Sequence, residues 1–468
     1  MGELLWLAGK AFLISLILTP IIRDISRSFN VVDRPGLRKV HAYPIPRVGG
    51  ISIAAAYVLA LLTVAGSGGS ISTAIHPAWK LIPGAALVFF TGLIDDFFSL
   101  KPVFKICGVV AAASVVFWGG LRVGGLAHHP LSPWLDYPLT ILWLLLTSNA
   151  LNLIDGLDGL CAGMGLLATL TLFAAALIHG NYPLAYVTLP LAGALVGFLC
   201  YNINPATVFL GDSGALLIGF LLGCYGMIWT QKASTLLSIL VPLLALSIPL
   251  LDVSLSVLRR FLRHQPLFEA DKGHIHHRLL DRGLSPGQAV WILSLFAALA
   301  AAFGLLVSAP IGGRYQGFII LLFCAVAFVG IRQLRYAEFD IAGRLLFHGE
   351  FQRTMDARLR LARVESALAL ATSDESWWEA VAQAGRILDL LAVRWTGAEG
   401  TREELLIPDA TPSWSFRIPL SETDAVEVDG SLQAEPVASF DLVSLAAMIT
   451  RTFPKERDPQ KHVATVSS

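Results

Sequence analysis

Asn149–Gly163 reads NALNLIDGLDGLCAG and stands at the end of an apolar run. Four polar residues recur there at every third position: Asn149, Asn152, Asp155 and Asp158. On an α-helix, steps of three residues drift by about 60°, so these side chains share roughly one half of the helix surface. Carboxylates at the mouth of a membrane segment are costly unless they are paired, bound to a metal or exposed to a watery cavity. The stretch therefore predicts a polar site at the end of a membrane-spanning helix.

The composition around this stretch is typical of a membrane protein. Of the 468 residues, 55% are hydrophobic and 15% are charged, with a mean hydropathy of +0.66, whereas a soluble domain has about 25% charged residues. Most charges lie in short segments and in the C-terminal portion, which predicts a polytopic membrane protein with a soluble tail. The formal net charge of zero gives no support for binding a nucleic-acid polymer. The five cysteines are scattered through apolar runs and are interpreted as small core residues.

Eleven apolar runs are long enough to span a bilayer, at about 20 residues per crossing. They cover about residues 4–22, 48–66, 80–94, 104–120, 137–154, 160–178, 183–201, 213–230, 234–258, 288–308 and 315–333. The loops between them are alternately rich and poor in Lys and Arg, and basic loops are cytoplasmic by the positive-inside rule. This alternation predicts an N-terminus outside and a C-terminus inside. The first run has neither a preceding basic region nor a following cleavage motif, so we expect a retained helix.

The polar clusters all fall on the predicted cytoplasmic side, at 33–50, 92–101, 149–158, 202–214 and 264–282. A one-sided site argues against a transporter, whose binding site lies near the bilayer midplane.

The composition predicts three parts of the chain. Residues 1–333 form a membrane-embedded core. Residues 334–453 combine helical patterns with short alternating segments, which predict a small cytoplasmic domain whose outline loosely resembles a GAF-type sensor fold. The alternating segments, which predict strands, are Leu391–Trp395, Trp414–Ile418 and Ala425–Val428. Residues 454–468 predict a disordered tail. The expected fold class is an all-α polytopic membrane protein of about eleven transmembrane helices, with a small C-terminal cytoplasmic α+β domain.

Two further motifs place carboxylates at the cytoplasmic ends of predicted spans. In GLIDDFFSLKP, Gly92–Pro102, the adjacent Asp95 and Asp96 repel each other and are tolerated where a divalent cation or a cationic substrate compensates. In YNINPATVFLGDSGA, Tyr201–Ala215, Asp212 begins a span and suits either capping of that helix or approach to a ligand. The simpler alternatives are exposed charges at a helix end and helix capping alone.

Two loops supply cations. DRPGLRKVHAYPIPRVGG contains Lys39, His41 and Arg47 and is interpreted as a phosphate-binding loop; the alternative is a basic loop that only sets the topology. DKGHIHHRLLDRGLS carries three histidines and Arg278, and contact with an anion or a phosphate is favoured over a zinc site or a solvated basic loop. Asp252, inside the ninth run, is interpreted as a functional carboxylate, or else as a hydrogen-bonding partner of a neighbouring helix.

Together these groups predict an enzyme whose substrates carry phosphate. Carboxylate oxygens suit Mg²⁺, which uses one or two protein carboxylates plus substrate phosphates; Mn²⁺ is the alternative metal. Lys, Arg and His suit the phosphates themselves. We therefore expect a Mg²⁺-dependent enzyme at the cytosolic membrane face, acting on a phosphorylated lipid and a phosphate-bearing water-soluble partner.

The motifs quoted above, in this order and spacing, resemble the polyprenyl-phosphate N-acetylhexosamine-1-phosphate transferases of glycosyltransferase family 4. The resemblance covers about residues 1–333 and implies an eleven-helix enzyme of the bacterial inner membrane. It implies transfer of a sugar 1-phosphate from a UDP-sugar to undecaprenyl phosphate, with release of UMP, to initiate a lipid-linked cell-surface glycan. The form H-I-H-H resembles the N-acetylglucosamine (GlcNAc) branch, and another UDP-amino sugar is the alternative donor. Membrane cores of this family often pair, which implies a homodimer.

The motifs and the resemblance together assign roles to single residues. The residues expected to be catalytic are Asp95, Asp96, Asp155, Asp158, His276 and His277. The residues expected to bind substrate are Lys39, His41, Arg47, Asn149, Asn152, Asn202, His274 and Arg278. The expected metal ligands are Asp212, Asp95 and Asp96. Asn149–Gly163 is then one wall of a cleft, and the metal is expected at Asp212.

The chemistry of the acceptor bears on the mechanism. A phosphate monoester has a second pKa of about 6, so undecaprenyl phosphate is largely dianionic at neutral pH and needs no strong base. Electrostatics and in-line positioning are expected to dominate, while a two-step scheme through a covalent sugar-phosphate on an aspartate stays open. Two other classes also stay open: an intramembrane prenyltransferase, which leaves the histidine loop unexplained, and a membrane-anchored sensor whose function lies in the C-terminal domain.

Overall fold

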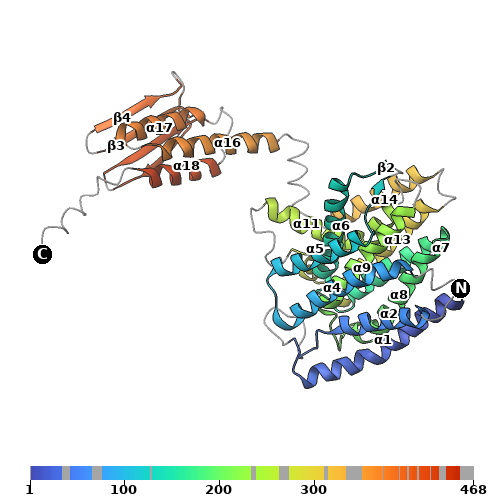
Figure 1. The fold of residues 1–468 in the computed structure, drawn as a ribbon. Helices are drawn as coiled ribbons and strands as arrows, with labels where there is room; N and C mark the ends of the chain where they lie inside the picture. Colours follow the sequence, from blue (N-terminus) through green and yellow to red (C-terminus); the bar gives the residue numbers. More distant parts are fainter. Residues whose placement is uncertain are drawn as a thin grey trace. The chain divides into compact units, whose positions relative to one another are not determined.

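The computed structural model describes residues 2–33, 43–65, 76–126, 129–232, 239–262, 273–309, 315–333, 350–371, 373–388, 390–397, 400–407, 411–421, 423–431 and 439–453. The chain forms two compact units, residues 1–336 and 337–468 (Figure 1). The first unit is helical, and the second combines helices with a sheet.

The helices of the first unit follow the predicted apolar runs, except for the short helix of the histidine motif. They are α1 (Gly2–Ser28), α2 (Gly49–Ala65), α4 (His76–Phe98), α5 (Pro102–Trp118), α6 (Pro133–Ile154), α7 (Leu160–Ile178), α8 (Tyr182–Asn202), α9 (Gly211–Lys232), α10 (Leu240–Ala245), α11 (Ser247–Leu262), α12 (Ile275–Asp281), α13 (Pro286–Ser308) and α14 (Gln316–Gln333), with a hairpin of β1 (Gly125–Leu126) and β2 (His129–Pro130) before α6. Within the described residues, seven helices are long and apolar enough to cross a bilayer, and others such as α2 and α5 are shorter apolar helices. The multi-pass membrane architecture is confirmed, while the count of eleven spans and their orientation stay predictions.

The ninth apolar run is not one continuous helix, contrary to the sequence prediction. The described part of 234–258 is divided into α10 and α11, with Leu246 between them. Pro249 lies in the first turn of α11 and has no N–H, so it cannot donate the next helical hydrogen bond to the carbonyl of Ala245. The break lets α10 pack against α13 while α11 packs against α6.

Helix α9 is the centre of the first unit. Of its apolar window, 94% is buried, and the helix packs against α2, α4 and α6. A Cβ atom at Gly219 would lie 2.7 Å from Cα of Ser148, and one at Gly223 would lie 3.0 Å from Cδ2 of Leu144. Glycines therefore allow α6 and α9 to approach closely in the membrane. Because the two helices run antiparallel, the C-terminal end of α6 lies beside the N-terminal end of α9.

The second unit is an antiparallel sheet packed against helices. Its elements are α16 (Glu350–Ala369), α17 (Asp374–Ile387), β3 (Ala392–Gly397), β4 (Gly400–Leu405), β5 (Trp414–Pro419), β6 (Ala425–Gly430) and α18 (Ser439–Thr452). The strand order is β4-β3-β6-β5, and the core between sheet and helices contains Trp377 and Trp395, whose rings lie 5.4 Å apart. This confirms the α+β class of the C-terminal part, while its cytoplasmic location and GAF-like identity stay predictions. Strand β4 was not predicted, because its side chains are almost all exposed and show no apolar alternation.

Candidate functional site

The loop before α2 pairs with the segment before α9. Phe209 N donates to the carbonyl of Pro46 (2.8 Å), and Gly49 N donates to the carbonyl of Phe209 (3.0 Å). This pairing brings Arg47 to the first turn of α9, where its Nη2 lies 3.6 Å from Asp212 Oδ1. Burial lowers the pKa of Arg47, but the negative charges of Asp212 and nearby carboxylates outweigh it, so the net shift is upward. The predicted phosphate-binding loop therefore contributes a permanent cation beside Asp212.

Asp96, at the end of α4, caps α9 from a neighbouring helix. Its carboxylate accepts hydrogen bonds from the backbone N–H groups of Asp212 (2.8 Å) and Ser213 (3.0 Å). These N–H groups lie in the first turn of α9, where no intrahelical acceptor exists. Gly211 has φ +77°, and a Cβ atom there would lie 2.8 Å from Asp96 Oδ2, so the site requires glycine. The contacts of Asp96 thus fix the start of α9, and its role as a metal ligand stays a prediction.

Asp95 is linked to α9 through Lys105 of α5. Lys105 Nζ forms ion pairs with Asp95 Oδ2 and with Asp212 Oδ2. Asp95 Oδ1 accepts a hydrogen bond from Leu100 N (2.6 Å). Both carboxylates are mostly buried, so the ammonium group offsets their mutual repulsion. Three charged side chains from three helices therefore meet at one point.

Lys105 belongs to this candidate site, and the sequence motifs did not identify it. The nearest cation after the aspartate pair in sequence is Lys101, but its side chain is exposed at the N-cap of α5 and makes no capping hydrogen bond. Lys105 lies one turn further, inside an apolar helix. A lysine in such a position is costly unless it is paired, and this signal could have identified it.

A cavity of about 710 Å³ lies between α4, α5, α6, α9 and α11. The predicted site residues that line it are Arg47, Asp95, Asn149, Asn152, Asp212 and His274. The polar lining also includes Lys105, Ser256 and Arg260. Its apolar lining includes Ile106, Leu142, Leu146, Val253 and Val257. The cavity therefore combines a charged end with an apolar wall.

Asp158 and Asn202 join two loops, and neither of them lines the cavity. Asp158 accepts hydrogen bonds from Asn204 Nδ2 (3.0 Å) and Ala206 N (3.0 Å), which ties the α6–α7 loop to the α8–α9 loop. Asn202 Oδ1 accepts a hydrogen bond from Gly159 N (3.1 Å) and adds a second tie between the same loops. These contacts indicate that both side chains hold the loops in place. Their catalytic and substrate-binding roles stay predictions.

Asp155 has an environment different from that of Asp158. It is half-buried beyond the end of α6. Removal from solvent raises the pKa of Asp155 to about 7; the charge of Asp212 adds to the increase and Arg47 opposes it. A carboxyl group that titrates near neutral pH can donate or accept a hydrogen bond beside a phosphate, which is compatible with the predicted catalytic role.

The histidine motif forms α12 and the residue before it. His274 lines the cavity, and its Nδ1 lies 2.9 Å from Asp252 Oδ2. His276 is 2% exposed and packs against Gly156, where a Cβ atom would lie 2.4 Å from His276 Nε2. Burial lowers the pKa of His276 to about 4, and His277 adds to the effect. His276 is therefore neutral at pH 7 and not part of a cationic cluster.

Of the remaining predicted residues, two do not line the cavity and two lie outside the described part of the chain. His277 and Arg278 are half-buried on α12, with the His277 ring 4.3 Å from the His276 ring. Lys39 and His41 lie outside the described residues.

The donor set fits the expected Mg²⁺. Asp95 and Asp212 come from different helices and converge on one cation, the ammonium group of Lys105. In the part of the chain that the structure describes, no three His, Cys, Asp or Glu side chains group as a metal site. Mg²⁺ takes one or two protein carboxylates and completes its shell with water and substrate phosphates, and Asp95 and Asp212 would supply those carboxylates. The metal itself stays a prediction.

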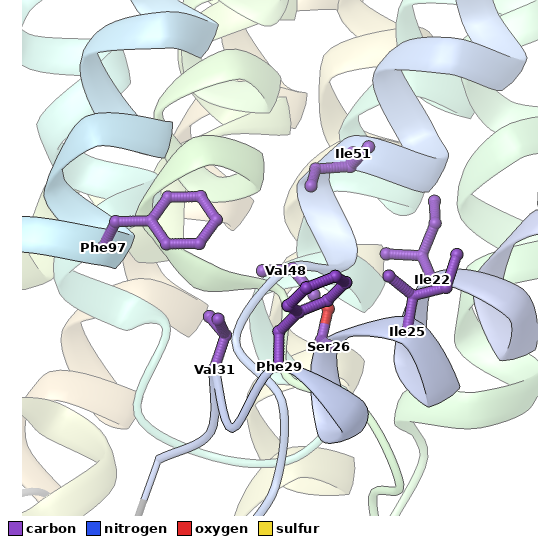
Figure 2. A pocket seen from close by; sticks show the side chains of 8 residues that line it. All are labelled: Ile22, Ile25, Ser26, Phe29, Val31, Val48, Ile51 and Phe97. Carbon is purple, nitrogen blue, oxygen red and sulfur yellow. The ribbon is translucent and has the colours of Figure 1, made fainter.

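A second groove of about 530 Å³ lies between α1, α2 and the end of α4. Figure 2 shows its lining, which is mainly apolar and includes Ile22, Ile25, Phe29 and Phe97. It offers no Lys, Arg or His from the described residues to a phosphate. The 710 Å³ cavity is therefore the candidate active site.

Comparisons with known proteins identify the family of this chain. Residues 78–230 match the family model described as Glycosyl transferase family 4. Over 294 residues the chain is 35% identical to the probable undecaprenyl-phosphate N-acetylglucosaminyl 1-phosphate transferase of Bacillus subtilis, covering 61% of this chain and 80% of the relative. It is 34% identical over 332 residues to the decaprenyl-phosphate N-acetylglucosaminephosphotransferase of Mycolicibacterium smegmatis, which covers 64% of this chain and 80% of the relative. It is 29% identical over 307 residues to the undecaprenyl-phosphate alpha-N-acetylglucosaminyl 1-phosphate transferase of Escherichia coli K12, which covers 63% of this chain and 81% of the relative.

The family expected from the motifs is thereby confirmed, and the chain belongs to glycosyl transferase family 4, the polyprenyl-phosphate N-acetylhexosamine-1-phosphate transferases.

Proposed function

We propose that this protein transfers GlcNAc 1-phosphate from UDP-GlcNAc to undecaprenyl phosphate, releasing UMP and initiating a lipid-linked cell-surface glycan. The observation that carries the proposal is the meeting of Asp95, Lys105 and Asp212 at a cavity with an apolar wall. A polyprenyl phosphate has the matching chemistry, with a charged head and an apolar tail. The names of the relatives specify a polyprenyl phosphate and N-acetylglucosamine, which supports this choice of acceptor and sugar.

In the proposed reaction, an oxygen of the lipid phosphate attacks the donor phosphorus that carries the sugar. The new phosphorus–oxygen bond forms while the bond to the UMP oxygen breaks. The acceptor phosphate is already largely dianionic at neutral pH, given its second pKa of about 6, so Asp95 need not remove a proton from it. Catalysis would come from positioning the two phosphates and offsetting their charge.

The cavity residues divide between these two tasks. Lys105 and Arg47 would offset the negative charge of the phosphates, and Arg47 can bind a phosphate through two N–H groups. Asp95 and Asp212 would hold Mg²⁺, which when bound supplies positive charge to the diphosphate. Asn149 and the backbone of the following loop would position the nucleotide. A covalent intermediate on an aspartate is the competing scheme, and exchange of labelled UMP into UDP-GlcNAc without a lipid acceptor would favour it.

The proposed setting is the bacterial inner membrane, with the N-terminus outside and the active site in the cytoplasm. The alternation of basic loops supports this orientation, and a homodimer is the expected assembly. The lining of the cavity belongs to the first unit. Truncation after residue 345 is therefore expected to keep full transferase activity in isolated membranes. Loss of turnover in a truncated protein that still folds would show that the membrane core is not self-contained.

The direct test is a donor panel with the purified full-length protein and undecaprenyl phosphate. UDP-GlcNAc is expected to give UMP and a butanol-extractable labelled lipid, ahead of UDP-GalNAc, UDP-QuiNAc and UDP-MurNAc-pentapeptide. A preference for another UDP-amino sugar would change the substrate but keep the chemistry. Absence of both products with every donor would refute the transferase and favour the prenyltransferase alternative.

The apolar wall of the cavity is expected to receive the polyprenyl chain. Leu142 is 59% exposed and lines this wall, so Leu142→Trp should occupy part of the lipid path. The polyprenyl chain would then lose the burial of about two of its methylene groups, each of which contributes roughly 0.8 kcal/mol to binding. This loss corresponds to about a tenfold rise in KM for undecaprenyl phosphate. KM for UDP-GlcNAc should stay unchanged.

The matched control for this prediction is Ile25→Trp. Ile25 is 51% exposed and lines the apolar groove of Figure 2. This variant should leave both KM values unchanged. If Ile25→Trp instead raises the acceptor KM and Leu142→Trp does not, the lipid enters by the groove between α1 and α4.

A further inference from the structure

Asp252 is a buried carboxylate that the proposed chemistry does not use. It is 1% exposed on α11, and the histidine loop engages both of its oxygens. Asp252 Oδ2 lies 2.9 Å from His274 Nδ1, and Oδ1 accepts a hydrogen bond from Ile275 N (2.8 Å). A carboxylate buried in an apolar helix is tolerated when it is paired and hydrogen-bonded. The partners of Asp252 therefore identify what it holds.

The first partner is the ring of His274. An imidazole nitrogen that faces a carboxylate carries the proton, so Nδ1–H donates to Asp252 and Nε2 is the ring nitrogen available to the cavity that His274 lines. Ser256 Oγ lies 3.4 Å from the same Nδ1, and Arg259 Nη2 donates to Ser256 Oγ (3.1 Å). The ring is thus oriented by groups of α11 on the side away from its Nε2.

The second partner is the start of α12. Ile275 is the first residue of this helix, so the same carboxylate also anchors the element that carries His276. The rings of His274 and His276 are stacked, with centroids 5.7 Å apart and planes 5° from parallel. His276 in turn packs against Gly156 at the end of α6. A shift of α12 would therefore move both histidines relative to the cavity.

We propose that Asp252 is a positioning residue for the transfer reaction. It holds His274 with Nε2 toward the cavity, and it holds α12 so that His276 stays against Gly156. Asp252 is not part of the cavity lining, so it acts on the substrate through His274. This inference rests on the proposed function, because its kinetic test measures the proposed transfer reaction.

The test is a double-mutant cycle between Asp252 and His274 in the full-length protein. Asp252→Asn is expected to lower kcat about 10–100-fold, by analogy with the loss of a carboxylate that orients a metal-binding histidine, and to leave KM for UDP-GlcNAc unchanged. The amide oxygen that remains in Asp252→Asn can still accept from Ile275 N, so this substitution mainly removes the contact with His274. In a His274→Gln background it should therefore cost no further turnover, because residues that act as a unit are non-additive. Losses that multiply in the double variant would overturn the proposal.

Asp136→Asn is the matched control for loss of a buried carboxylate. Asp136 is also 1% exposed, accepts a hydrogen bond from Gly124 N (2.8 Å) and pairs with Arg122 at the opposite end of α6. It should lower the thermal stability and keep the wild-type kcat. If Asp252→Asn fails to fold, Asp252→Glu enters the same cycle, because it keeps the charge and displaces the oxygens.

A second measurement separates this inference from the proposed function. If the wild-type protein transfers no sugar phosphate from any donor, the proposed function fails. Nitrogen-15 NMR of the histidines then tests the positioning directly. A protected His274 Nδ1–H signal that is lost in Asp252→Asn supports the inference, and a His274 ring that is unaffected by the substitution refutes it.

Discussion

Replacing Lys105 by methionine is expected to lower kcat about 10²–10³-fold, the range found when one charge-stabilising donor is removed from an active site. Methionine keeps the length of the side chain and removes the charge. Asp95 and Asp212 then face each other without the ammonium group that pairs with both, and the phosphates lose a cation. The measurement is UMP release at saturating UDP-GlcNAc and undecaprenyl phosphate.

Lys101→Met provides the control for the Lys105 prediction. Lys101 precedes the same helix, and its side chain is exposed, so the substitution removes an equal charge without touching the site. It should keep wild-type turnover. If Lys105→Met retains more than about a tenth of the activity, or if both lysine variants lose it equally, the central place given to Lys105 is wrong.

The fold could be predicted from the sequence where the signal is local. Apolar runs of bilayer length gave the helices, because a membrane helix satisfies its own backbone and is marked by composition alone. The break in the ninth run depends on Pro249 together with the different partners of α10 and α11, so composition did not reveal it. Strand β4 was missed because it is an edge strand of the described sheet that pairs only with β3, and its exposed charged residues such as Arg402 and Glu403 show no apolar pattern.

The sequence indicated which polar residues belong to the candidate site, but it did not indicate which contacts each of them makes. Asp95 and Asp96 are equivalent in sequence, yet Asp95 pairs with Lys105 while Asp96 accepts backbone hydrogen bonds from α9. Asp158 belongs to the same polar stretch as Asn152 but ties two loops together. These differences arise from contacts between residues far apart in the chain, and no local pattern specifies them.

Asp212→Ala is expected to reduce turnover by at least about 10³-fold and to abolish the effect of Mg²⁺ on nucleotide binding. Asp212 is the carboxylate that meets both Arg47 and Lys105 at the cavity, so it would hold a metal that supplies positive charge to the diphosphate. In the wild type, EDTA should weaken binding of UDP-GlcNAc measured by calorimetry. In Asp212→Ala the affinity should be the same with and without Mg²⁺, and retained Mg²⁺-dependent activity would refute the assignment.

Asp96→Asn separates loss of a metal ligand from loss of the helix cap. The two backbone N–H groups that donate to Asp96 remain in the variant, but an amide offers one acceptor oxygen in place of two and carries no charge. Hydrogen bonds to charged groups contribute about 1.5–3 kcal/mol each, so a lower apparent Tm is expected, with partial activity and an unchanged Mg²⁺ dependence. If Asp96→Asn instead matches Asp212→Ala, with wild-type Tm and no response to Mg²⁺, then Asp96 binds the metal and the start of α9 is held by other contacts. Comparison of the two variants therefore decides whether Asp96 serves the metal or only the start of α9.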